Sequence, residues 1–178
     1  MADEKKEPWL NYLALTTVII AVCATLATFK GGGFSTRQIL SQTRASDQWA
    51  YYQAKSVKSN LYELAKAEAE LGAKVLPAGA PAAAREAYEN RIKDLAAKVA
   101  KYDREKDEIQ AEARRLEAVR DDAAKHGYAF GIAVIFLQIS ILLSSIAALL
   151  KKKPVWVLGL AVGLGGIVWF LDGFWLLF

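Results

Sequence analysis

The feature that most constrains this chain is the separation of its apolar and charged residues into long blocks. Residues 9–29 and 128–150 contain no charged side chain, and residues 155–178 contain a single one, Asp172. A helix rises ~1.5 Å per residue, so each of these runs is long enough to cross the ~30 Å hydrocarbon core of a bilayer. The sequence therefore predicts an all-α integral membrane protein with three transmembrane helices, the third followed by a short tail.

The charged residues lie mainly between the first two runs. Residues 30–127 hold 18 of the 23 Lys and Arg residues and 15 of the 19 Asp and Glu residues. Positive and negative side chains alternate there, whereas a nucleic-acid surface gathers its basic residues on one face. We therefore expect the lipid bilayer, and no nucleic acid, as a partner. A short polar N-terminus (1–8) and a basic loop (151–154) complete the organisation.

Apolar residues in the middle segment recur every three or four positions, which is the spacing of helices that pair in coiled coils. One stripe comprises Leu40, Thr43, Asp47, Ala50, Ala54, Val57, Leu61, Leu64, Glu68, Leu71 and Val75. The other comprises Tyr88, Ile92, Leu95, Val99, Tyr102, Lys106, Ile109, Ala113, Leu116, Arg120 and Ala123. Between them, "PAGAPAAA" (77–84) stops one helix and starts another. We expect an extramembrane antiparallel helical hairpin, coiled-coil-like, with arms at 35–76 and 82–126 and these stripes in contact.

The two junctions between membrane and hairpin differ. "KGGGFSTRQ" (30–38) has three consecutive glycines, each costing ~1 kcal/mol in a helix, and Ser35 with Gln38 fits a capping box. We therefore expect a break in the helix at the glycines. A phosphate-binding loop is the alternative, and it is disfavoured because the Gly-Lys-Ser/Thr ending is missing. At the other junction only Gly127 intervenes, so the second arm is expected to continue into the membrane.

Two groups of residues are candidate assembly contacts. The stretch "ASDQWAYYQAKS" (45–56) places Trp49, Tyr51 and Tyr52 together, and aromatic side chains are favoured at the centres of interfaces. Contact between chains is the first interpretation, and packing within the hairpin is the alternative. In the third run, Gly159 and Gly163 form a GxxxG pair that permits close approach of another helix.

Polar residues within the apolar runs suggest a second class of function. An acid inside a bilayer is costly and often functional, so Asp172, with Gln138 on the second run, is a candidate intramembrane polar site. Alternatively, Asp172 lies at the far interface beside Trp169 and Trp175. No catalytic, cofactor or metal site is expected, because the single histidine, His126, has no second histidine or cysteine to share a metal. We expect the protein not to be an enzyme and to need no cofactor.

Loop charge predicts the orientation. The loop "KKKP" (151–154) is short and purely basic, and such loops lie on the cytoplasmic side. The N-terminus is then also cytoplasmic and the hairpin lies outside, which in a Gram-negative cell, with its inner membrane, means the periplasm. A two-helix hairpin with many alanines at its contact buries little apolar area. We therefore expect a homo-oligomer or a protein partner.

The motifs also resemble a known family. The span "WLNYLALTTVIIAVCATLATF", the hinge "KGGGFSTR" and the helix "ASDQWAYYQAKSVKSNLYEL" are similar to those of a bacterial membrane protein family classed as a domain of unknown function. The resemblance implies a bacterial membrane setting and supplies no activity or catalytic residue. The expected function is a non-enzymatic membrane scaffold that assembles through its hairpin and Gly-rich third span. The alternative is a channel or transport component using Asp172 and the polar face of the second span.

Overall fold

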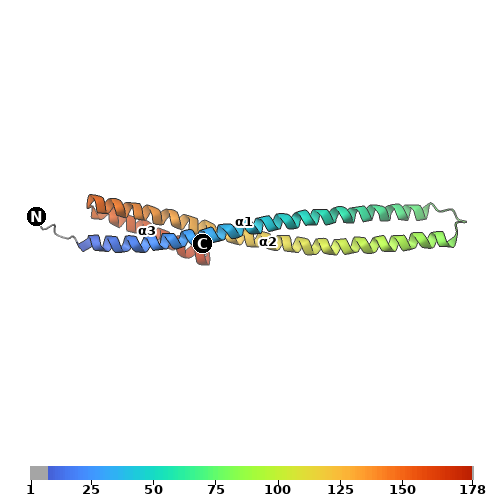
Figure 1. Ribbon diagram of the computed structural model, residues 1–178, viewed down its shortest axis with the longest axis horizontal. Helices are drawn as coiled ribbons and strands as arrows, with labels where there is room; N and C mark the ends of the chain where they lie inside the picture. Colours follow the sequence, from blue (N-terminus) through green and yellow to red (C-terminus); the bar gives the residue numbers. More distant parts are fainter. Residues whose placement is uncertain (1–7, 178) are drawn as a thin grey trace, which may run out of the picture. The chain divides into compact units, whose positions relative to one another are not determined.

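The computed structural model describes residues 8–177, which form three helices and, within that range, no strand (Figure 1). They are α1 (Pro8–Lys74), α2 (Ala82–Leu150) and α3 (Lys153–Trp175). The prediction of an all-α chain is confirmed. The predicted polar N-terminus, residues 1–8, lies outside the described residues except for Pro8.

The break predicted at the three glycines is wrong, because α1 is one continuous helix of 67 residues that contains Gly31, Gly32 and Gly33. A glycine weakens a helix without preventing it, and long helical segments on both sides hold these three in place. Gly31 also has a packing role, since a Cβ there would lie 3.2 Å from Cβ of Phe130. The expected continuation of the second arm is correct: α2 passes through Gly127 without interruption.

The chain divides into two compact units, although α1 and α2 each contribute to both. One unit holds the chain up to Leu40 and from Val119 onward, and the other is Ser41–Ala118. Each unit is described separately below.

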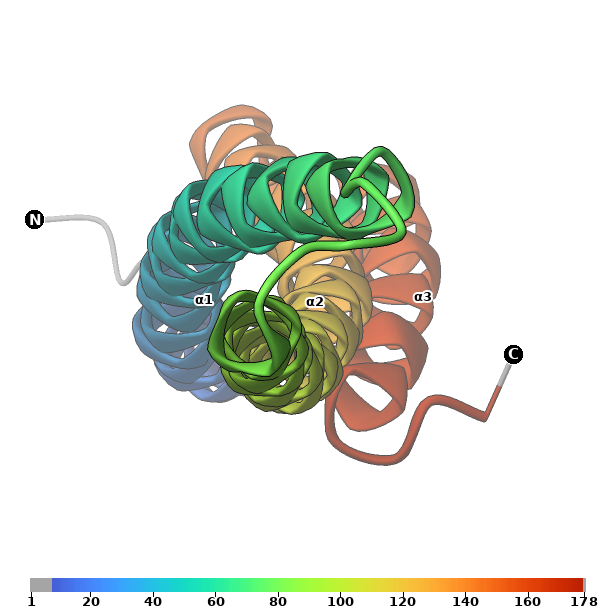
Figure 2. The ribbon, with the colours of Figure 1, turned by 90° about the vertical axis from the view of Figure 1, so that its right-hand side faces the viewer.

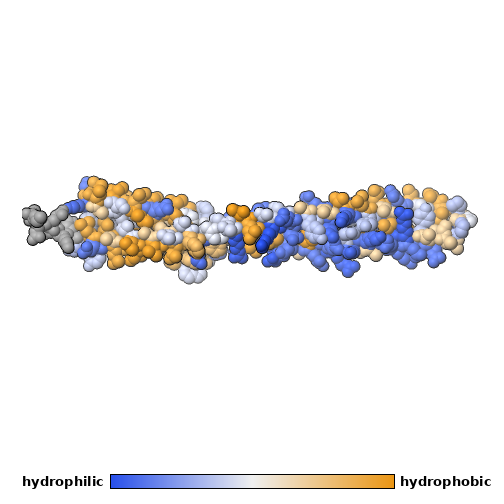
Figure 3. Space-filling view, viewed as in Figure 1, coloured by the Kyte–Doolittle hydropathy of each residue, from blue (hydrophilic) through white to orange (hydrophobic). Residues whose placement is uncertain are grey.

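The first unit contains the apolar parts of α1 and α2 together with all of α3. All three helices are long and apolar enough to cross a membrane. Its core has two clusters of buried residues, one around Leu137 and one around Phe130. Trp9 and Trp156 lie with ring centroids 6.0 Å apart, while Phe130 meets Phe174 edge to face. Many large apolar side chains of this unit are exposed, and the face seen in Figure 3 is largely apolar.

In the unit Ser41–Ala118, segments of α1 and α2 lie side by side and are joined by a loop at residues 75–81 (Figure 2). Trp49 contacts Glu117 and Ser59 contacts Asp103, so partner numbers in α2 fall as those in α1 rise. The predicted stripe of α2 faces this contact, because all of its members within this unit are buried or half-buried. The most buried of them are Leu95, Ile109, Ala113 and Leu116.

Candidate functional site

An apolar stripe on α1 lies at the surface of the unit Ser41–Ala118. Five of its side chains are each 59–70% exposed: Val57, Leu61, Leu64 and Leu71 on α1, and Val75, which directly follows the last residue of α1. We call these five residues the outer stripe. They occur at the steps of three, four and seven by which helices pair in coiled coils. Figure 3 shows apolar patches among the polar residues along α1 in this unit.

The prediction that this stripe contacts α2 is therefore wrong. The side of α1 that meets α2 instead carries small and aromatic residues: Ala45, Tyr52, Ser59, Tyr62 and Ala69. Ser59 follows Val57 by two residues, which is ~200° around a helix with 3.6 residues per turn. The outer stripe thus lies on the opposite side of α1 from the contact with α2.

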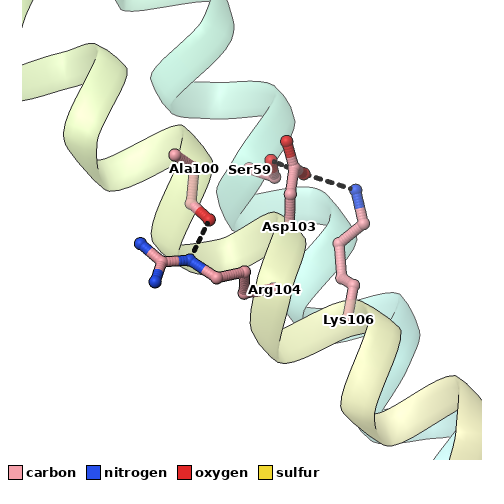
Figure 4. A network of polar contacts seen from close by, with 5 residues as sticks. All are labelled: Ser59, Ala100, Asp103, Arg104 and Lys106. Carbon is pink, nitrogen blue, oxygen red and sulfur yellow. Dashed lines mark hydrogen bonds and ion pairs between the residues drawn. The ribbon is translucent and has the colours of Figure 1, made fainter.

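Charged residues on α2 explain why α1 presents its less apolar side. Lys55 Nζ lies 2.6 Å from Glu105 Oε2, and the Ser59 hydroxyl donates a hydrogen bond of 3.0 Å to Asp103 Oδ1. Lys106 Nζ donates to the same Asp103 oxygen at 2.9 Å (Figure 4). A leucine face would bring apolar groups against these polar atoms and leave them without partners, which is costly. The polar contacts therefore select the side of α1.

These contacts also lower the pKa values of the Glu105 and Asp103 carboxylates. The hydrogen bond from Lys55 lowers the pKa of Glu105 below its ordinary value. The hydrogen bond from Lys106, followed by that from Ser59, lowers the pKa of Asp103. In each case the partner stabilises the charged form of the acid.

The three aromatic residues predicted as assembly contacts have different surroundings. Trp49 Nε1 donates a hydrogen bond of 2.9 Å to Glu117 Oε1, and its ring meets the edge of Tyr52 with centroids 5.6 Å apart. Tyr51 is half exposed, and Lys55 Nζ lies 5.1 Å from the centre of its ring. Trp49 and Tyr52 therefore pack within the unit, the alternative left open by the sequence, and Tyr51 alone remains at the surface.

Gly159 and Gly163 of α3 are buried against α2 of the same chain. A Cβ at Gly159 would lie 3.1 Å from Cβ of Leu143, and one at Gly163 would lie 2.7 Å from Oγ of Ser140. The Ser140 hydroxyl also donates a 2.6 Å hydrogen bond to the Gly159 carbonyl. The predicted close helix approach is present, but it occurs within one chain, so these glycines are not a surface for another copy.

The structure does not bring Asp172 and Gln138 together in one site. Asp172 is buried near the end of α3, where its carboxylate accepts a 2.6 Å hydrogen bond from the Leu177 amide. Its carbonyl accepts another from the Leu176 amide at 2.7 Å. Gln138 is exposed on α2. Asp172 thus caps the C-terminus of α3, and a path shared with Gln138 finds no support.

His126 has a packing role that the sequence did not reveal. Its ring stacks on Phe34 with centroids 4.6 Å apart, and its Nδ1 lies 2.8 Å from the Gly173 carbonyl oxygen. Because a carbonyl only accepts, Nδ1 carries a proton. His126 therefore ties α1, α2 and α3 together within the first unit. Within residues 8–177, no three His, Cys, Asp or Glu side chains gather as a metal site.

These features define an all-helical protein with three helices apolar enough to span a membrane. Residues 9–176 match a family described as a domain of unknown function (DUF4337), and the chain belongs to that family. A search of curated proteins and a search of solved structures each returned no match.

Proposed function

We propose that this protein is a non-enzymatic scaffold of the bacterial inner membrane that assembles by pairing its outer stripe with that of a second copy. In this proposal three transmembrane helices anchor an antiparallel hairpin formed by 35–76 and 82–126. The basic loop at 151–154 supports an orientation with the N-terminus in the cytoplasm and the hairpin in the periplasm. The observation that carries the proposal is the exposure of five apolar side chains at coiled-coil spacing on one side of α1.

Only α1 offers such a surface in this part of the chain. The exposed side of α2 is strongly charged and carries Glu89, Lys93, Lys101, Arg104, Asp107 and Glu108 among others. Charged side chains of both signs keep that side solvated. The outer stripe, in contrast, is apolar apart from the exposed Glu68 between Leu64 and Leu71, and exposed apolar surfaces of this kind mark protein contacts.

The outer stripe is complementary to itself when two copies run in opposite directions. With Leu61 placed opposite Leu64 of the second copy, the same pair forms twice at the centre. Leu71 then faces Ala54, and Val75 faces Ala50, so large residues meet small ones. Ala50 and Ala54 are both exposed and available for this contact. Such alternation of large and small side chains favours close packing.

Charge favours the same arrangement. Glu68, exposed within the stripe, would face Val57 of the second copy beside the exposed Lys58. If two copies ran in the same direction in register, Glu68 would instead meet Glu68, and like charges at a helix contact repel. Pairing in opposite directions requires two hairpins that reach toward each other along one membrane surface.

The test is the mass of the full-length protein in detergent. Leu61→Ser with Leu64→Ser should convert a two-chain particle into a one-chain particle while leaving helix content unchanged, because both side chains are already mostly exposed. The control is Ala97→Ser with Ala100→Ser on the exposed side of α2, which should leave the assembly intact. A wild-type protein that sizes as one chain would overturn the proposal.

A further inference from the structure

A hollow on the surface of α1 lies where the first charge-free run ends. Its volume is about 660 Å³, and its lining includes Phe29, Lys30, Gly32, Gly33 and Arg37. Phe29 is the last residue of the charge-free run and Lys30 is the first charged residue after it. In a chain that spans a membrane, the hollow therefore lies at the level of the lipid headgroups.

Gly32 and Gly33 create the hollow. Packing against the other described residues does not require glycine at either position. A Cβ at either position would meet nothing within 4 Å. Their neighbour Gly31 differs, because a Cβ there would approach Phe130 to 3.2 Å. Two glycines in the middle of a helix lower its stability relative to alanine. Their presence on open surface points to something from outside that approaches the helix closely.

The side chains around the hollow indicate the chemistry of that ligand. Lys30 and Arg37 are both on its lining, and two cations favour a phosphate group. Arginine suits phosphate because its planar fork donates two hydrogen bonds at once. Phe29 also lines the hollow, and its side chain is apolar and 77% exposed.

An exposed apolar strip, the lane, continues from Phe29 along the same side of α1. Leu26 and Val22 are both about half exposed, and the spacing of 22, 26, 29 and 33 keeps them on one helix face. A phospholipid fits this arrangement, because its phosphate would lie in the hollow while an acyl chain follows Phe29, Leu26 and Val22. A free phosphate ion would use the two cations but not the lane.

We propose that this hollow binds the headgroup of an anionic phospholipid, such as phosphatidylglycerol. A zwitterionic lipid carries its own ammonium group, which the neighbouring Lys30 and Arg37 would repel. This inference rests on the membrane-spanning placement proposed above, but not on the pairing of hairpins. It assigns Gly32 and Gly33 a role in admitting the headgroup.

The test measures lipid retained by the full-length protein in native mass spectrometry, after exchange into detergent containing phosphatidylglycerol or phosphatidylcholine. Two variants address the site separately. Gly32→Leu with Gly33→Leu fills the hollow without an internal clash, and Lys30→Gln with Arg37→Gln removes the cations. The matched control, Lys152→Gln with Lys153→Gln, removes the same charge at the start of α3.

Wild type should retain phosphatidylglycerol at least about five-fold more than phosphatidylcholine, and both site variants should lose that preference while the control keeps it. Equal retention of the two lipids, or equal loss in the control, would overturn the inference. So would complete displacement of the lipid by inorganic phosphate, which would indicate a free phosphate site. Failure of the protein to float with membranes would refute the proposed membrane scaffold, whereas flotation without lipid preference would refute only the headgroup site.

Discussion

Ser59 on α1 donates a hydrogen bond of 3.0 Å to Asp103 on α2, and the serine is 1% exposed. A small polar residue in this position lets the two helices approach while it satisfies a carboxylate oxygen. The pair therefore contributes both to the spacing of α1 and α2 and to which side of α1 faces α2.

The first prediction concerns Ser59. Ser59→Ala removes one hydrogen bond without changing the spacing and should lower the free energy of unfolding by about 1 kcal/mol. Ser59→Leu also forces extra volume between the helices and should cost about 1–3 kcal/mol more. Thermal unfolding of the full chain, followed by circular dichroism, measures both. Equal effects of the two substitutions would mean that Ser59 is not enclosed by α2.

The second prediction is a loss of stability in acid. Because Lys55 and Lys106 hold the pKa values of Glu105 and Asp103 below their ordinary values, the folded form binds these protons less readily than the unfolded form. Their contribution is fully present above the ordinary Glu pKa of 4.5 and is lost as the pH falls through the lower folded pKa values. The unfolding temperature should therefore fall between pH 6 and pH 3.

A variant comparison separates these two acids from the others. Glu105→Gln with Asp103→Asn should be less stable than wild type at pH 6 and should approach it at pH 3. The same two chemical changes at exposed positions of α2, Glu108→Gln with Asp107→Asn, provide the control. If the Glu105→Gln, Asp103→Asn variant and the control respond identically to pH, the two ion pairs do not cause the loss of stability in acid.

The third prediction uses two glycines of the first unit. A Cβ at Gly173 would lie 2.8 Å from the ring of Phe130, so Gly173→Ala should push α3 from α2 and cost about 1–3 kcal/mol. Gly131→Ala meets nothing within 4 Å and should stabilise the helix by about 0.5–1 kcal/mol. Thermal stability in detergent should therefore change in opposite directions. A lower thermal stability of both variants would show that the contact with Phe130 is not what separates Gly173 from Gly131.

Much of the helical architecture could be predicted from hydropathy and spacing, and the errors have physical causes. Apolar spacing predicts the buried stripe of α2 correctly, because α2 has no second apolar side in the unit Ser41–Ala118. On α1, by contrast, two sides carry the same repeat, and apolar spacing favours the more apolar one. The polar groups of α2, such as Glu105 and Asp103, determine which side of α1 faces α2. A pattern of apolar spacing contains no information about these polar contacts.

The glycines show the same limit. Helix propensity predicted a break at residues 31–33, but propensity is a weak preference that neighbouring structure overrides. GxxxG spacing predicted close approach at Gly159 and Gly163, and the approach is present. The spacing alone did not distinguish a helix of the same chain from one of another copy. For Asp172, position near the end of the apolar run suggested an interfacial role, and its hydrogen bond to the Leu177 amide gives it a capping role there.

The most direct test of the proposed pairing is disulfide formation between single cysteines in a Cys23→Ala background, which removes the one native cysteine. Ala54→Cys and Leu71→Cys proteins with different tags are purified separately, mixed in detergent and oxidised. The account predicts that the mixed pair cross-links efficiently and that neither variant cross-links with itself. Cross-linking of each variant with itself would show copies running in the same direction, and the absence of any cross-link would show that the outer stripe is not the contact.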